Sequence, residues 1–129
     1  MLRLFIADES VEVRKRLAEL VAGIPGVELV GQAGSALEAI AGIGVLTPAV
    51  VILDIHMPGG NGLQVLAAIT ALNAPPKVIV LTAFPYPQYR QSCLAAGADY
   101  FYDKASQFEE LVAVLEGMVR VNQDLIERP

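Results

Sequence analysis

The sequence has too few cysteines for a disulfide and too few basic residues for a nucleic-acid-binding face. Cys93 is the only cysteine among 129 residues, so no internal disulfide can form, which favours a cytoplasmic location. Lys and Arg number 9 against 14 Asp and Glu, for a formal net charge of -5. Phosphate backbones attract Lys- and Arg-rich faces, and no segment is left over for a helix-turn-helix. We therefore expect no direct contact with nucleic acid.

Long apolar runs and targeting segments are also missing. The longest apolar runs have the length of strands, so we expect no membrane-spanning helix. Asp8 interrupts the apolar start of the chain too early for a signal peptide. With 54% hydrophobic and 18% charged residues, the chain is expected to fold rather than stay disordered. The length favours one domain over residues 1–129 with a full hydrophobic core.

The most informative stretch is an apolar run that ends at a carboxylate. Residues 49–54 read Ala-Val-Val-Ile-Leu-Asp, and such a run is typical of a strand buried on both faces of a parallel sheet. A loop with Pro58 and three glycines follows Asp54 directly. Open α/β folds bind ligands at the carboxyl ends of their strands, so we expect Asp54 to stand in a ligand site.

Four other apolar runs predict strands, and helix signals separate them. The predicted strands cover residues 2–7, 27–33, 77–82 and 99–103. Five helices are predicted. The first follows Ser10, the second covers residues 36–43, and the third follows the glycine loop and ends before Pro75. The fourth ends at Gly97, and the fifth runs from Ser106 to about Glu127. Five strands alternating with five helices predict an α/β fold with a doubly wound parallel sheet, right-handed crossovers and helices on both faces.

Two helix ends carry specific signals. Gly42 and Gly44 are expected to close the helix over residues 36–43, because glycine is favoured just beyond helix ends. Ser106 and Glu109 have the spacing of a capping box, which predicts Ser106 as the N-cap of the last helix.

Polar residues fall where the predicted strands end. They are Asp8, Glu9, Asp54, Thr82 and Lys104. Because parallel strands end at one edge of their sheet, these side chains are expected to converge. Three carboxylates at one mouth repel each other, and oxygen ligands select a hard cation such as Mg2+. An amine and a hydroxyl nearby would meet phosphoryl oxygens that the metal leaves free. This set fits the formation of an aspartyl-phosphate.

The same residues, in this order and spacing, strongly resemble the receiver domains of two-component response regulators. The motifs are Asp8-Glu9, Asp54-x-x-Met57-Pro58 with Gly62, Thr82-Ala83 and Lys104, and the resemblance covers the whole chain. It implies a flavodoxin-like sheet with strand order 2-1-3-4-5. It also implies that a histidine kinase or a phosphotransfer protein donates a phosphoryl group, and that the domain catalyses this transfer and its own dephosphorylation without turning over an independent substrate.

The resemblance assigns a role to each site residue. Asp54 matches the phosphoacceptor, and Asp8 and Glu9 match the acidic pair that holds Mg2+. The backbone carbonyl of His56 matches the third protein ligand of the metal. Thr82 and Lys104 match the residues that contact the phosphoryl group. Phe101 matches the aromatic switch that turns inward when the Thr82 hydroxyl moves, and its alternative role is that of an ordinary core aromatic.

Three positions depart from the pattern of that family. Glu9 stands where Asp is commoner, and Phe101 where Tyr is commoner. Ala105 follows Lys104, where the family usually has Pro with a cis bond. A cis bond before a residue other than Pro costs about 2.5–4 kcal/mol, so we expect the Lys104–Ala105 bond to be trans. The imidazole of His56 is expected to face solvent over the site and modulate access, since His suits softer metals.

The last helix carries more apolar residues than one sheet-facing side needs. Beside its core stripe, a second stripe is formed by Val114, Met118, Val121 and Leu125. The helix is either broadly buried or contacts a partner. In receivers the surface made by the fifth strand and its flanking helices is the usual output face, which favours a downstream protein target or a homodimer there.

Other readings stay open. The chain could be a receiver domain cut from a longer regulator, or a silent receiver-like binding module. A metal-dependent aspartyl-phosphate phosphatase is the weakest alternative, because His56 stands where such hydrolases carry a second acid and no substrate-cap insertion is visible.

Overall fold

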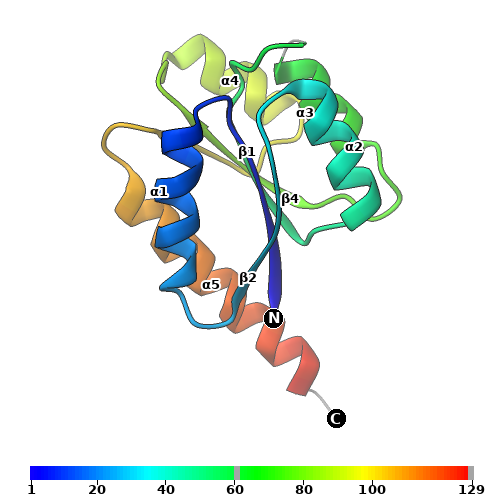
Figure 1. Ribbon diagram of the computed structural model, residues 1–129, viewed down its shortest axis with the longest axis vertical. Coiled ribbons are helices and arrows are strands. Elements are labelled where there is room, and N and C mark those ends of the chain that lie inside the picture. Colours follow the sequence, from blue (N-terminus) through cyan, green and yellow to red (C-terminus); the bar gives the residue numbers. More distant parts are fainter. Residues whose placement is uncertain (60–61, 128–129) are drawn as a thin grey trace.

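Five parallel strands form one sheet in the order β2-β1-β3-β4-β5, with helices against both of its faces (Figure 1). The computed structural model describes residues 1–59 and 62–127. The strand order and the helices on both faces confirm the predicted doubly wound, flavodoxin-like fold. Strand β1 (Leu2–Ala7) pairs with β2 (Val27–Ala33) on one side and with β3 (Val50–Leu53) on the other. The strand order reverses at this point, which is where open α/β sheets place their ligands.

All predicted strands and helices are present. The remaining strands are β4 (Lys77–Thr82) and β5 (Tyr100–Asp103). The helices are α1 (Val11–Ala22), α2 (Ala36–Leu46), α3 (Gly62–Thr70), α4 (Pro87–Ala95) and α5 (Phe108–Glu127). In the described part of the chain, none of these helices combines the length and the apolar character needed to cross a bilayer.

The sheet separates two apolar layers. Leu4 and Ile6 of β1 pack with α1 and α5 on one face, while Phe5 and Ala7 pack with α2, α3 and α4 on the other. Side chains alternate along a strand, so a strand that is apolar at every position can serve both layers. Figure 1 shows α1 and α5 on one side of the sheet and α2 and α3 on the other.

Helix α2 runs further than predicted. It continues through Gly42 and Gly44 to Leu46. The cap residue Thr47 has a left-handed backbone (φ 45°), and its N–H donates to the Ile43 carbonyl at 2.9 Å. Gly42 has a packing role instead, because a Cβ there would lie 3.0 Å from the ring of Phe5. The predicted closure of this helix by glycines is therefore wrong.

Two other helix ends differ from the prediction, and a side-chain hydrogen bond lies near each of them. Helix α3 stops at Thr70, well before Pro75, and the Thr70 hydroxyl donates to the Leu66 carbonyl at 2.8 Å. Helix α5 begins at Phe108, so Ser106 is not its N-cap. The Ser106 hydroxyl instead donates to a carboxylate oxygen of Asp103 at 2.9 Å. Side-chain hydrogen bonds of this kind compete with helical bonding and move helix ends.

Candidate functional site

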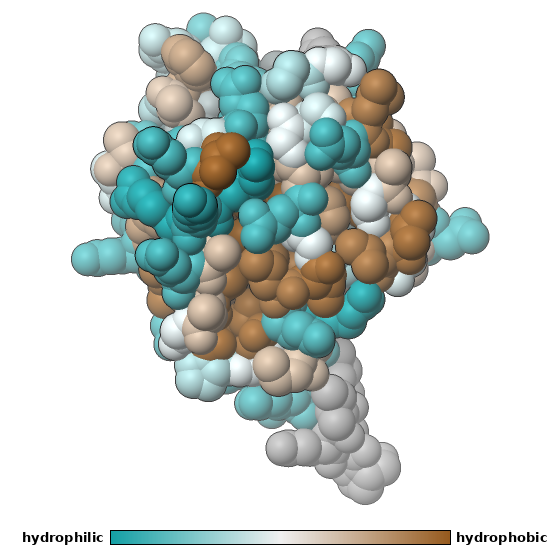
Figure 2. Space-filling model, in the orientation of Figure 1, coloured by the Kyte–Doolittle hydropathy of each residue, from teal (hydrophilic) through white to brown (hydrophobic). Residues whose placement is uncertain are grey.

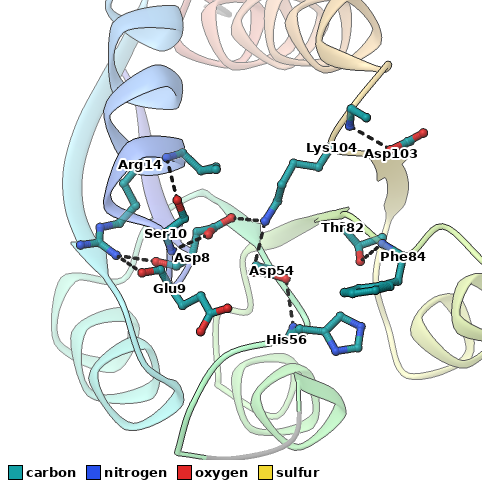
Figure 3. Close-up of polar contacts among 12 residues, drawn as sticks. Asp8, Glu9, Ser10, Arg14, Asp54, His56, Thr82, Phe84, Asp103 and Lys104 are labelled. Atoms are coloured by element: carbon teal, nitrogen blue, oxygen red, sulfur yellow. Dashed lines mark hydrogen bonds and ion pairs between the residues drawn. The ribbon is translucent and has the colours of Figure 1, made fainter.

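Two aspartates and a lysine meet at the carboxyl edge of the sheet. Asp8 follows β1 and Asp54 follows β3, and these residues are only 2% and 5% exposed. The Lys104 ammonium lies 2.6 Å from Oδ2 of Asp8 and 3.2 Å from Oδ2 of Asp54 (Figure 3). Five residues were expected to converge at this edge. Direct ion pairs join three of them, Asp8, Asp54 and Lys104.

Backbone N–H groups engage the second oxygen of each aspartate. The Ser10 N–H donates to Oδ1 of Asp8 at 2.9 Å, and the His56 N–H donates to Oδ1 of Asp54 at 3.0 Å. The backbone of Asp54 is also fixed to the neighbouring strand, because the Asp54 N–H donates to the Ala7 carbonyl at 2.8 Å. Each carboxylate is therefore held at both oxygens and points toward Lys104.

Burial and the Lys104 ion pairs together set the pKa values of the cluster. Desolvation raises the pKa of Asp54, and the charge of Asp8 raises it further, although the His56 N–H and Lys104 lower it. Burial alone would lower the pKa of Lys104, but the hydrogen bond to Asp8 and the charges of Asp54 and Asp8 outweigh it, so the pKa is raised. With both aspartates ionised, one ammonium leaves a net negative charge that a further cation would neutralise.

Thr82 reaches the same edge from β4. It is fully buried, and its hydroxyl oxygen accepts a hydrogen bond from the Phe84 N–H at 3.0 Å. The Lys104 N–H donates to the Thr82 carbonyl at 2.7 Å, which ties the lysine to the end of β4. In the described part of the chain, the Thr82 hydroxyl is thus engaged by the loop after β4 and not by Asp54 (Figure 3).

Glu9 stands apart from the buried aspartates. It is exposed and lines a hollow of about 540 Å³ together with His56. Within residues 1–59 and 62–127, no group of three or more acidic, His or Cys side chains is placed to hold a metal ion. Hard cations prefer oxygen ligands. Such ligands are available here from the carboxylates of Asp8 and Asp54, which share one ammonium, and from the nearby backbone of His56.

Glycines shape the loop that carries His56. Gly59 has a φ of 85°, which favours glycine, and a Cβ on Gly62 would overlap the backbone of Ile55. The Pro58 carbonyl accepts the Ala36 N–H at 3.0 Å, so the loop is attached to the start of α2. The third glycine of this loop, Gly60, lies outside the described residues.

Comparison with known proteins identifies the family. Residues 4–116 match the family model of the response regulator receiver domain. The chain belongs to this family. It is 28% identical over 116 residues to the DNA-binding transcriptional activator DevR/DosR of Mycobacterium tuberculosis, which covers 90% of this chain and 54% of that protein.

Solved receiver structures have the same fold. The signal receiver domain of the response regulator NarL from Mycobacterium tuberculosis superposes with a TM-score of 0.84 at 28% identity, covering 92% of this chain and 96% of that one. The CheX-CheY-BeF3-Mg2+ complex from Borrelia burgdorferi matches with a TM-score of 0.76 at 26% identity, covering 88% and 89%. The chain spans between 22% and 60% of the length of the curated relatives compared with it.

The position matched to the receiver switch is buried in this structure. Phe101 is 5% exposed and belongs to the apolar layer under α2, α3 and α4. Its neighbours Tyr100 and Tyr102 stack on each other, with ring centroids 6.0 Å apart. The backbone carbonyl of Phe101 accepts a hydrogen bond from Arg90 of α4 at 3.3 Å. This part of the receiver thus links β5 to α4, but its switching role stays a prediction.

The second stripe of α5 is partly buried. Val114 and Met118 pack against the layer formed with α1, whereas Val121 is 60% exposed. The side chain of Leu125 lies outside the described residues. Val114 and Met118 are only half-buried, so the choice between a broadly buried helix and a partner contact stays a prediction.

Sequence reasoning missed two features of the receiver site. Arg14 folds back from α1, and its Nη1 lies 2.6 Å from the Asp8 carbonyl and 3.3 Å from the Glu9 carbonyl. Arg14 is followed by two more basic residues, a pattern typical of a solvated helix surface, so the sequence carries no signal for this contact. The exposed His56 ring packs edge-on against Phe84 and Tyr89, at centroid distances of 4.7 and 5.6 Å.

The described peptide bonds are all trans, so the expectation for the Lys104–Ala105 bond is confirmed.

Proposed function

We propose that this receiver domain accepts a phosphoryl group on Asp54 from a histidine kinase or a phosphotransfer protein, in the cytoplasm. The observation that carries the proposal is the buried cluster in which Asp54 and Asp8 share the Lys104 ammonium. In the transfer, the nitrogen–phosphorus bond of a phosphohistidine breaks while an Asp54 oxygen bonds to phosphorus, and the electron pair stays on the imidazole. No independent substrate is turned over.

Each residue of the cluster has a distinct task in this proposal. Lys104 neutralises charge on the transferring group, since positioning and charge neutralisation supply most of the catalysis in phosphoryl transfer. Thr82 donates its hydroxyl to a phosphoryl oxygen after giving up its bond from the Phe84 N–H. The movement of Thr82 and the inward position of Phe101 form the proposed two-state switch.

The donors at this edge suit Mg2+. Asp8, Asp54 and the backbone carbonyl of His56 would hold the ion, and Glu9 would add a further carboxylate from the adjoining hollow. When bound, the metal shields the carboxylate from the incoming phosphate. The Borrelia CheX-CheY complex contains Mg2+ with beryllofluoride, which supports the same chemistry in this relative of CheY.

The proposed output face is β5 with its flanking helices. Tyr100 is 37% exposed and Val121 is 60% exposed on this face. The face would contact a downstream protein or a second copy of the domain once Asp54 is phosphorylated. DevR/DosR is a DNA-binding relative that is longer than this chain. In a full regulator of that kind, a separate output domain would bind the DNA. The receiver itself would bind no nucleic acid.

Phosphorylation is tested by mass. After incubation with acetyl phosphate and Mg2+, the intact mass of the wild type should rise by one phosphoryl group, and Asp54→Asn should stay unchanged. Asp99→Asn, which removes an aspartate at the opposite edge, is the matched control and should be phosphorylated normally. An unmodified wild type, or a modified Asp54→Asn, would reject the proposal.

The silent receiver-like module is the second candidate. It is favoured by Glu9, which is exposed and not grouped with the other acids. Beryllofluoride with Mg2+ separates the two candidates, because it should change amide exchange near Thr82 and Phe101 in a phosphorylatable receiver. A silent module would show the same exchange with and without these reagents.

A further inference from the structure

One basic residue of α1 turns back toward the candidate site. Hydrophilic residues gather over α1 in the space-filling view (Figure 2). Lys15 and Arg16 are exposed, whereas Arg14 is half-buried. The Nη1 atom of Arg14 lies 2.6 Å from the Asp8 carbonyl oxygen and 3.3 Å from the Glu9 carbonyl oxygen (Figure 3). One nitrogen thus holds the backbone of both residues of the acidic pair.

The contact with Glu9 reaches the Asp8 carboxylate through one peptide unit. The Glu9 carbonyl and the Ser10 N–H belong to the same planar unit, which moves as one body. Its oxygen accepts a hydrogen bond from Arg14 at 3.3 Å, and its N–H donates to Oδ1 of Asp8 at 2.9 Å. The bond from Arg14 to the Asp8 carbonyl holds the adjoining unit. The guanidinium therefore fixes both peptide units that follow Asp8, and with them the direction of its carboxylate.

Gly34 leaves room for the guanidinium. A Cβ on Gly34 would have the Arg14 guanidinium as its nearest neighbour, with Nη1 only 2.9 Å away. Gly34 follows β2 directly, and the Asp8 N–H donates to the carbonyl of Ala33, the last residue of that strand, at 3.0 Å. Gly34 is not among the glycines with a positive φ, so its backbone accepts alanine. A methyl group at this position would therefore displace the guanidinium without straining the loop.

We propose that Arg14 is a positioning residue for the Mg2+ site, which sets the affinity for the ion by fixing the acidic pair. The inference rests on the proposed function, in which Asp8 holds the ion and Glu9 adds a carboxylate. Arg14 binds the backbone carbonyls of this pair, so it acts through the metal ligands and not on the phosphoryl group. Groups that orient metal ligands typically change metal affinity by about ten- to hundredfold when they are removed.

The charge of Arg14 works against the same ion. A guanidinium beside the acidic pair repels Mg2+, although water and salt screen the repulsion because the side chain is only half-buried. Variants that keep the positive charge therefore isolate the positioning effect. Arg14→Lys keeps a cation on a shorter side chain that lacks Nη1. Gly34→Ala keeps Arg14 itself but displaces its guanidinium. Arg14→Gln removes the repulsion together with the positioning, so its two effects partly cancel.

Thermal melts over a series of Mg2+ concentrations measure the affinity of each variant without any phosphorylation, and the melt without metal checks that the variant folds. The Mg2+ dissociation constant should rise about tenfold in Arg14→Lys and in Gly34→Ala, and by less in Arg14→Gln. Arg3→Gln is the matched control, because Nη1 of Arg3 donates to the Thr47 carbonyl at 3.0 Å near the amino end of β1. This control should bind Mg2+ as the wild type does.

Phosphorylation by acetyl phosphate gives an independent readout. The Mg2+ concentration for the half-maximal rate should rise about tenfold in Arg14→Lys, with the rate at saturating Mg2+ within about twofold of the wild type. Unchanged Mg2+ affinity in Arg14→Lys and Gly34→Ala would overturn the role of Arg14, while the phosphorylation of Asp54 would stand. An equal loss of affinity in Arg3→Gln would overturn it too. A wild type that Mg2+ neither stabilises nor activates would reject the proposed metal site and, with it, this inference.

Discussion

The two ends of the sheet each carry a lysine paired with aspartate, in opposite surroundings. At the carboxyl end, Lys104 lies 2.6 and 3.2 Å from two aspartates, and the side chains are between 2% and 17% exposed. At the amino end, Lys77 lies 3.8 Å from Asp99, with side chains 68% and 33% exposed. The same residue types are therefore strongly coupled at one end and largely solvated at the other.

This difference shows why residue type alone does not mark a site. Buried charges carry a large desolvation cost and persist only when each one is compensated, whereas an exposed pair contributes little either way. The buried end holds more acid than base, so it favours a further cation. The exposed end is electrically balanced and has no such demand.

The largest expected effect comes from removing the buried ammonium. Lys104→Met leaves Asp8 and Asp54 facing each other without compensation, and we expect the free energy of unfolding at pH 7 to fall by about 3 kcal/mol. Lys77→Met, the matched control at the exposed end, should change it by less than about 0.5 kcal/mol. Urea denaturation measures both. Equal losses from the two variants would contradict the contrast between the two ends.

The contribution of Lys104 should also depend on pH. Its pKa in the folded protein is raised above the ordinary 10.5, so the folded state holds this proton more tightly than the unfolded state. The stabilisation is then fully present below about pH 10.5 and is lost as the pH rises through the raised pKa. The difference in stability between the wild type and Lys104→Met should shrink across that alkaline range, and a constant difference would count against it.

Magnesium should stabilise the buried end alone. At a concentration ten times its dissociation constant, a ligand that binds only the folded state adds about 1.4 kcal/mol, or about 5 °C in Tm for a domain of this size. We expect this rise in the wild type and in Asp99→Asn, but not in Asp8→Asn. Thermal melts with Mg2+ and with chelator measure it. A rise that survives Asp8→Asn would show that the metal binds elsewhere.

The apolar strands are the reason that this contrast is visible in the sequence. A strand buried on both faces must be apolar at every position, so the first polar residue marks its end. The resemblance supplies the strand order, and the convergence of Asp8, Asp54 and Lys104 follows from parallel strands ending at one edge. The fold and the centre of the candidate site could both be predicted in this way.

What the sequence does not reveal are contacts between side chains of different elements. Gly42 has the character of a helix end, but it is needed inside α2 because the ring of Phe5 lies against it. Arg14 has the pattern of a solvated helix residue, but it binds backbone carbonyls beside Asp8. Glu9 follows Asp8 directly and yet is exposed, since the chain turns there into the first helix. Such details depend on packing distances that no spacing rule contains.

Asp54→Asn should stabilise the fold while abolishing phosphorylation. Burial raises the pKa of Asp54 despite its bonds to His56 and Lys104, so the ionised carboxylate destabilises the folded state relative to the unfolded one above the ordinary pKa. The neutral amide keeps an acceptor for the His56 N–H and leaves Lys104 paired with Asp8. We expect the free energy of unfolding, measured by urea denaturation at pH 7, to increase. A loss of stability would mean that the Lys104 pair outweighs burial.

The smallest effect belongs to Asp99, where the ion pair and a hydrogen bond can be separated. Its Oδ2 accepts the Val78 N–H at 2.8 Å, while its other oxygen faces the exposed ammonium of Lys77 at 3.8 Å. Asp99→Asn keeps an acceptor and loses only the charge, so unfolding should change by less than about 0.5 kcal/mol. Asp99→Ala also loses the bond to the start of β4 and should cost about 1 kcal/mol. If Asp99→Asn cost as much as Asp99→Ala, the charge would matter at this end too, and exposure would no longer explain why the two ends differ.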